Sequence, residues 1–171
     1  MYRKLFLVLI CILSFSTLSC AEAFPNEPNG FRDLRWGESL QDIQSKGYDP
    51  VYVGYFARQN AVVYGAFLAD PYISNQKSSF ISLYFWNNKL YSIVVNFGEP
   101  YKYDASADAM FSSLCSLHGF KFITYGNDGW SWYGDTANVS LVKNKDGTFC
   151  VILTSEYYES KATEDAASKG W

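Results

Sequence analysis

Hydrophobic and polar positions alternate most regularly over residues 79–97. The dipeptide Asn87-Asn88 interrupts the alternation, and both residues tolerate the positive φ that a tight hairpin requires. We therefore expect two antiparallel strands joined at this turn. Both faces of the first strand are apolar or aromatic, which is typical of a strand in the middle of a sheet. The two sets are Ile81, Leu83 and Phe85 on one face, and Tyr84 and Trp86 on the other.

Further strand patterns, rich in Val, Tyr and Phe, flank this hairpin. Turns rich in Gly, Asn and Asp separate them, and Asp146-Gly147 predicts a second tight hairpin near the end of the chain. The expected strands cover residues 51–57, 62–69, 121–125, 130–133, 138–143 and 148–154.

Two segments carry the signals of helices. Ser39 is a favourable N-cap with Asp42 three residues later, and Gly47 predicts the end of a short first helix. A longer helix is expected over residues 104–118, because its apolar positions fall on one stripe and Gly119 follows. The stripe consists of Ala107, Met110, Phe111, Leu114, Cys115 and His118.

These elements predict an α+β fold, with an antiparallel sheet of about seven to eight strands and two helices packed on it. Residues 39–97 and 104–154 each contain a helix followed by strands, which suggests two similar helix-plus-sheet units. We expect a single α+β domain over residues 24–155. A polar C-terminal tail is expected over residues 156–171, in which residues 161–169 form either a frayed helix or a loose tail.

The chain begins with the pattern of a signal peptide over residues 1–23. A basic start precedes an apolar run at residues 5–15, and Ala21-Glu22-Ala23 provides small residues for cleavage. A second interpretation is a bacterial lipobox ending at Cys20, which would be lipidated. Both predict export: to the periplasm or the extracellular space in the first case, and to the outer membrane as a lipoprotein in the second. No later stretch is long enough for a transmembrane helix.

Charge narrows the possible function classes. The chain of 171 residues carries a formal net charge of −3, and loss of Arg3, Lys4 and Glu22 with the signal peptide changes it to −4. A mildly acidic protein without a run of basic residues is a poor candidate for nucleic-acid binding. We therefore expect no nucleic-acid partner.

Two cysteines, Cys115 and Cys150, remain after the predicted signal peptide. A cysteine pair in an exported protein most often forms a disulfide. Such a bridge would join the second helix to the last strand. The alternative is two separately buried free thiols, which behave as small hydrophobic side chains.

Residues with catalytic or metal-binding chemistry are sparse. The single histidine, His118, is a candidate general base or metal ligand, and the alternative is a cationic group at a helix C-terminus. Asp128, Asp135 and Asp146 lie in predicted turns, where Asp is common because it bonds to nearby backbone. The sequence contains no Gly-x-Ser-x-Gly elbow, phosphate-binding loop or dinucleotide fingerprint. We expect no catalytic residue, no cofactor and no metal.

The most suggestive candidate for a binding surface is Trp130, Trp132 and Tyr133. The two indoles share one face of a regular strand, where they would form a stacking surface for sugar rings or a hot spot for a protein partner. The alternative is that they belong to the core and pack on the second helix.

Two motifs resemble parts of small exported bacterial proteins of unknown function. They are Phe31-Arg32-x-Leu34-x-Trp36-Gly37 before a short capped helix, and the hairpin Phe85-Trp86-Asn87-Asn88-Lys89-Leu90. The resemblance implies no catalytic residue. The sequence as a whole predicts an exported, non-enzymatic binding protein whose partner is a protein or an envelope component. Saccharide binding through Trp130 and Trp132 is the second hypothesis, and a hydrolase with an unrecognised site is the third.

Overall fold

The computed structural model describes residues 23–102 and 105–170. Residues 1–22 of the predicted signal peptide, and with them the lipidation alternative at Cys20, lie outside the described residues. In the described part no helix is long and apolar enough to cross a membrane.

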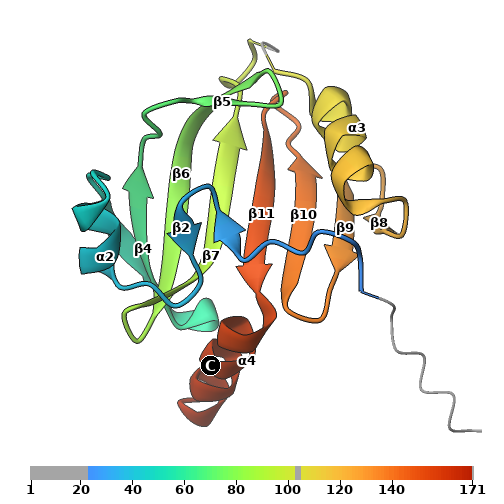
Figure 1. The fold of residues 1–171 in the computed structure, drawn as a ribbon. Helices are drawn as coiled ribbons and strands as arrows, with labels where there is room; N and C mark the ends of the chain where they lie inside the picture. The colour runs from blue at the N-terminus through green and yellow to red at the C-terminus, as the bar shows by residue number, and fades with distance from the viewer. Residues whose placement is uncertain (1–22, 103–104, 171) are drawn as a thin grey trace, which may run out of the picture.

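Three helices, a short 3₁₀ helix and eleven strands make up the described fold (Figure 1). The helices are α2 (Leu40–Ser45), α3 (Ala107–His118) and α4 (Glu156–Ser168), and the 3₁₀ helix is η1 (Ala57–Gln59). The strands are β1 (Gly30–Phe31), β2 (Leu34–Arg35), β3 (Val51–Phe56), β4 (Ala61–Ala66), β5 (Tyr72–Ile73), β6 (Gln76–Trp86), β7 (Lys89–Phe97), β8 (Ile123–Tyr125), β9 (Gly129–Tyr133), β10 (Ala137–Lys143) and β11 (Phe149–Ser155).

One large antiparallel sheet dominates the fold and confirms the α+β class. Its strands follow the order β3-β4-β6-β7-β11-β10-β9-β8, with β5 paired to β6 at one end, and β1 and β2 form a separate small hairpin. The helices α2 and α3 each precede a run of antiparallel strands, and the two runs meet where β7 pairs with β11. The similarity of the two helix-plus-sheet units stays a prediction.

The hairpin β6–β7 has the predicted turn. Asn87 and Asn88 have φ values of 47° and 58°, so both adopt the left-handed conformation that a two-residue hairpin requires. The turn also supports the first helix, because the Asn88 side chain accepts a hydrogen bond from the backbone N–H of Leu40 at 3.1 Å. The predicted capping box between Ser39 and Asp42 is present at the start of α2.

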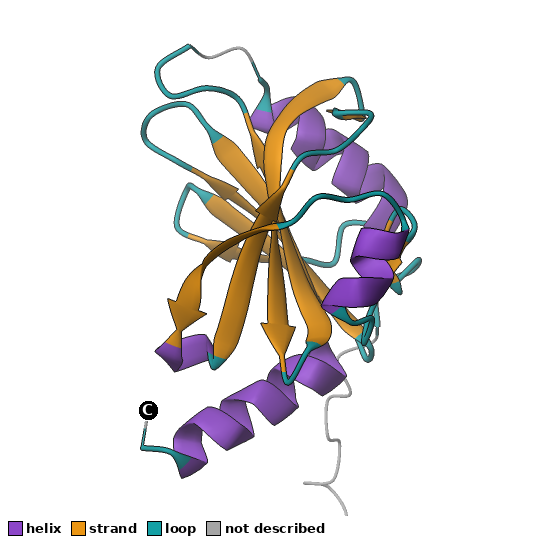
Figure 2. Ribbon diagram, turned by 90° about the vertical axis from the view of Figure 1, so that its left-hand side faces the viewer, coloured by secondary structure: helices purple, strands orange, loops and turns teal. Residues whose placement is uncertain are grey.

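The two faces of the sheet differ in what covers them. Helices α2 and α3 lie on one face, together with the N-terminal segment (residues 23–37), whereas the opposite face is largely open (Figures 1 and 2). The core lies under the covered face. Its largest fully buried side chains include Phe85, Phe97, Trp132 and Phe149.

The C-terminal residues differ from the expected polar tail. They form helix α4, which lies across one end of the sheet, where Ala162 and Ala166 are buried (Figure 1). The Asp165 carboxylate on this helix accepts hydrogen bonds from Trp86 Nε1 at 3.0 Å and Asn60 Nδ2 at 2.7 Å. The only buried apolar side chains of α4 are these two alanines, so its hydrophobic stripe is too weak to recognise in the sequence.

The predicted disulfide between Cys115 and Cys150 is wrong, because both thiols are free. Cys115 lies on α3 and faces the core. On β11, Phe149 and Val151 point into the same core, so alternation directs Cys150 to the opposite face of the sheet. The sheet therefore separates the two sulfur atoms.

We expect alkylation in denaturant without reductant to modify both Cys115 and Cys150 completely, as measured by peptide mass spectrometry. Burial raises the pKa of both thiols, so the native protein should react slowly near neutral pH. Cys150, which is less buried, should be labelled before Cys115. Recovery of a peptide pair joined through these residues would contradict the arrangement.

Candidate functional site

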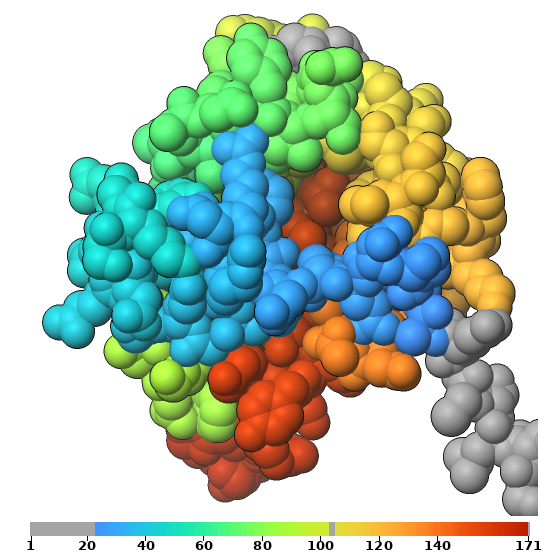
Figure 3. Space-filling model, viewed as in Figure 1, coloured from blue at the N-terminus to red at the C-terminus, as the bar shows by residue number. Residues whose placement is uncertain are grey.

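An apolar cavity lies on the covered face of the sheet, among the N-terminal segment, the β5–β6 turn and α3. It has a volume of about 340 Å³, and Figure 3 shows it as a hollow near the centre of the molecule, with β11 at its base. The sheet contributes Val95, Phe97, Val151 and Leu153 to the lining, and α3 contributes Met110, Leu114 and Leu117. The interior of the sheet thus forms the floor of the cavity and α3 forms one wall.

The N-terminal segment forms the roof and is attached to the end of α3. The Phe24 ring is buried and packs edge-on against the His118 ring, with their centroids 5.0 Å apart. Asn26 Nδ2 donates a hydrogen bond to the carbonyl of Leu117 at 2.7 Å. The sequence predicted only an extended lead-in here, whereas the structure makes this segment part of the site.

Glu27 attaches the same segment to the turn between β9 and β10. Its carboxylate accepts hydrogen bonds from the backbone N–H groups of Asp135, Thr136 and Ala137, at 2.9, 2.6 and 3.1 Å, and from the Thr136 hydroxyl. Burial raises the pKa of Glu27, but these hydrogen bonds outweigh that effect and hold the pKa below its ordinary value. The carboxylate is therefore ionised near neutral pH.

Gly134 makes this approach of Glu27 possible. A Cβ at position 134 would lie 2.6 Å from Glu27 Oε2 and 2.6 Å from the Ala137 carbonyl oxygen, closer than any side chain tolerates. Glycine is therefore required at position 134 because there is no room for a side chain. Nothing in the local sequence indicated it, because Glu27 is more than a hundred residues away.

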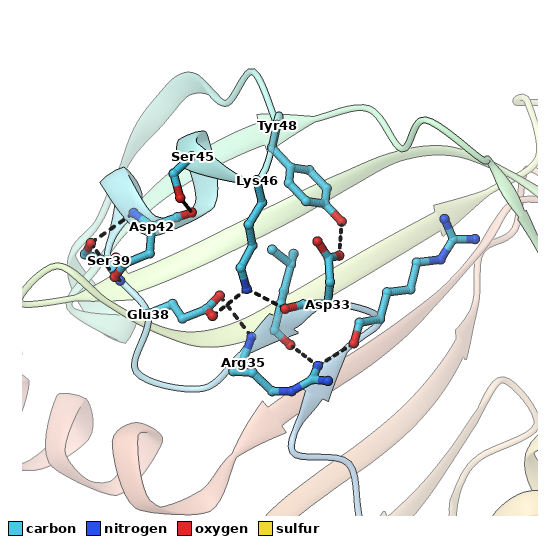
Figure 4. Close-up of polar contacts among 10 residues, drawn as sticks. Asp33, Arg35, Glu38, Ser39, Asp42, Ser45, Lys46 and Tyr48 are labelled. Atoms are coloured by element: carbon cyan, nitrogen blue, oxygen red, sulfur yellow. Dashed lines mark hydrogen bonds and ion pairs between the residues drawn. The ribbon is translucent and has the colours of Figure 1, made fainter.

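The β1–β2 hairpin continues the roof and is held to α2 by a polar network (Figure 4). Lys46 donates to the Asp33 carbonyl and forms an ion pair with Glu38, while the Tyr48 hydroxyl donates to Asp33 Oδ1 at 2.7 Å. Burial and this hydrogen bond raise the pKa of Tyr48 to about 12. The hydrogen bond from Tyr48 lowers the pKa of Asp33.

Arg32 brings a positive charge to the cavity. It lies in the turn between β1 and β2 with φ 56° and lines the cavity. Its Nη1 and Nη2 atoms donate to the carbonyl oxygens of Asp70 and Tyr72. These two hydrogen bonds hold the roof to β5 and to the residues just before it. The nearest acid in an ion pair with Arg32 is Asp70, whose exposed Oδ2 atom is 3.9 Å away.

His118 also lines the cavity, but not as the cation considered from the sequence. Burial lowers the pKa of His118 more than its hydrogen bond to the Pro25 carbonyl raises it, so the ring is neutral near pH 7. The ring packs between Phe24 and Trp132. Among residues 23–102 and 105–170, no group of three or more His, Cys, Asp or Glu is arranged to hold a metal ion.

The suggested surface of Trp130, Trp132 and Tyr133 is not formed. The two indoles share one face of β9, as predicted, but that face is the core, where Trp132 is fully buried and donates from Nε1 to the Gly119 carbonyl at 2.9 Å. Trp130 is partly covered by Phe111 and Lys143. Tyr133 lies on the opposite face, so the three side chains offer no common platform for a saccharide.

Comparison of the chain with protein-family models, curated proteins and solved structures found no match. The features of the site that bear on function are therefore the lining of the cavity and the contacts that hold its roof. The residues that sequence reasoning missed are Glu27, Arg32 and Gly134, since each acts through a partner remote along the chain.

We expect Glu27→Gln to lower the free energy of unfolding by about 1–3 kcal/mol at neutral pH, because the amide leaves some of the turn N–H groups without an acceptor. The pKa of Glu27 is lowered on folding, so its contribution is present above the unfolded-state pKa of about 4.5 and is lost as the pH falls through the folded-state value. Urea titrations should therefore show the wild type and the variant converging in acid. The surface variant Glu164→Gln is the control.

Gly134→Ala should produce a similar loss, because its Cβ displaces the Glu27 carboxylate. The effects of Glu27→Gln and Gly134→Ala should be partly non-additive in a double-mutant cycle, since both disrupt the Glu27 contact, whereas the clash with the Ala137 carbonyl oxygen belongs to Gly134→Ala alone. Gly54→Ala is the matched control, because a Cβ there meets only the Phe56 ring, at 3.8 Å. Additive effects would show that Gly134 acts independently of Glu27.

Proposed function

We propose that this protein is an exported, non-enzymatic binding protein that holds a small, mainly apolar ligand in the cavity beneath the N-terminal segment. The cavity of about 340 Å³ between this segment, α3 and the sheet is the observation that carries the proposal. The signal-peptide pattern of residues 1–23 supports export.

The size and the lining of the cavity favour a ligand over a packing defect. The cavity opens to the surface, where Figure 3 shows it as a hollow, so a ligand can reach its apolar lining directly. Engineered apolar cavities of about 150 Å³ already bind benzene, and ligand sites typically begin near 300 Å³. Aliphatic and aromatic side chains from the sheet and α3 provide most of the wall.

The charge at the cavity favours a ligand with an anionic end. Arg32 is the one charged side chain among the described lining residues, which include no Asp or Glu, and His118 is neutral near pH 7. Its Nη atoms bind two carbonyl oxygens, which hold the guanidinium in place, and its charge is only partly balanced by the exposed Asp70 carboxylate at 3.9 Å. A linear carboxylate with an apolar tail matches this arrangement. Such a ligand is compatible with an envelope component as the partner.

The polar groups of the cavity support binding over catalysis. Arg32, His118 and Ser113 each use a polar atom in a hydrogen bond to a backbone carbonyl oxygen, at Asp70, Pro25 and Ala109 respectively. These contacts position the side chains for recognition and for holding the roof. No pair of these side chains is hydrogen-bonded in the manner of a nucleophile and its base.

We expect Ser113→Phe to abolish binding of octanoate, measured by isothermal titration calorimetry, because position 113 lines the cavity and the ring would occupy it. Ser112→Phe is the matched control. Both serines lie on α3 and donate to the carbonyl four residues earlier, but Ser112 lies outside the lining. Equal binding by wild type and Ser113→Phe would overturn the proposal, as would no binding of octanoate or of 1-octanol to the wild type.

Arg32→Gln should weaken octanoate binding by about tenfold or more, which corresponds to one charge-assisted hydrogen bond. Binding of the uncharged 1-octanol should change much less. This comparison separates charge recognition from damage to the roof, because damage would weaken both ligands equally.

A further inference from the structure

Strand β3 forms one edge of the large sheet and exposes an unusual set of side chains. Val51, Tyr52, Val53, Tyr55 and Phe56 are each between 42% and 65% exposed, and the remaining residue of the strand is Gly54. In Figure 2, β3 is the outer strand that leads into η1 at the margin of the sheet. Six consecutive residues thus present an uncharged edge to solvent.

Such an edge is a site for pairing with another strand. An edge strand carries outward-facing N–H and C=O groups, and folded proteins usually protect them with charge, proline, a bulge or a covering element. Strand β3 contains no Lys, Arg, Asp, Glu or Pro, and within the described residues it pairs only with β4. Its one protective feature is a bulge between Tyr52 and Gly54.

We infer that β3 pairs in antiparallel fashion with β3 of a second copy of this chain. A two-fold axis at the centre of the strand brings Tyr52 opposite Tyr55 of the second copy, and Val51 opposite Phe56. Like charges on two copies of one strand would repel each other across such an axis. Strand β3 carries no charged side chain, so nothing of this kind opposes the pairing. The extended sheet then runs continuously through both copies.

The side-chain directions agree with this symmetric register. Tyr52 pairs with Tyr64 and Tyr55 pairs with Val62, two residues of β4 that share a face. Val51 and Phe56 pair with Gly65 and Ala61, on the other face. The bulge therefore keeps both tyrosines on one side and gives cross-strand aromatic contacts on that side.

The bulge itself is accommodated at the centre of the interface. In the symmetric register Val53 lies opposite Gly54 of the second copy, where no side chain competes for space. Phe67, which is 79% exposed, follows β4 close in register to the start of β3. The contact is small beside a standard interface of about 1,600 Å², so we expect a weak dimer in rapid exchange.

Sedimentation velocity over a range of concentrations tests this pairing. The wild type should change from monomer to dimer as the concentration rises, and Val53→Lys should remain monomeric because two ammonium groups would meet near the axis. Ile123→Lys is the matched control, since Ile123 is 55% exposed on β8 at the opposite edge and Val53 is 59% exposed. Circular dichroism should confirm that all three proteins are folded.

A charge-swap experiment separates lost pairing from lost folding. Val53→Glu should also be monomeric alone, and mixing it with Val53→Lys should restore a dimer of mixed composition. A wild type that stays monomeric at every concentration overturns the inference and leaves the edge to an extended segment of a different protein. Dimerisation that survives Val53→Lys, that is lost in Ile123→Lys, or that does not return on mixing also overturns it.

Discussion

The contact between the Glu27 carboxylate and the turn at residues 135–137 determines where the N-terminal segment lies. This segment has little secondary structure of its own, because β1 and β2 contain two residues each. Its path across the sheet depends on contacts with distant parts of the chain. Backbone hydrogen bonds join Gly37 and Glu38 to Leu90, and among the side chains Glu27 provides the largest group of hydrogen bonds. The absence of a side chain at Gly134 is part of the same interaction.

The cavity follows from that placement. Its floor belongs to the sheet, whose ladders run uninterrupted through β7 and β11, while its roof is attached by Glu27, Asn26, Arg32 and the ring of Phe24. Phe24 and Leu34 of this segment are buried in the core, and backbone hydrogen bonds join Gly37 and Glu38 to Leu90 on β7. The roof is thus fixed at several points along its length, and the cavity is formed as part of the fold.

The open face of the sheet satisfies its polar groups across neighbouring strands. Ser131 and Ser140 share a hydrogen bond at 2.7 Å, and Ser92 and Thr154 share another at 2.8 Å. Alternation also directs Cys150 to this face, which is why it lies apart from Cys115 on α3. Along β9, β10 and β11, residues that point into the core alternate with residues of this open face.

Local patterns in the sequence were sufficient for most of the secondary structure. The sequence by itself determined the turn at Asn87-Asn88, the capping box at Ser39 and the stripe on α3. Each depends on a local pattern, in which a residue and the next one that matters are no more than four positions apart. For helix α4 the sequence left a frayed helix and a loose tail as alternatives, since only Ala162 and Ala166 are buried. The tertiary structure alone decided which face of β9 is core, where Cys150 points, and how Glu27, Gly134 and Arg32 build the site. Each of these depends on contacts between residues far apart in sequence, and no local pattern encodes them.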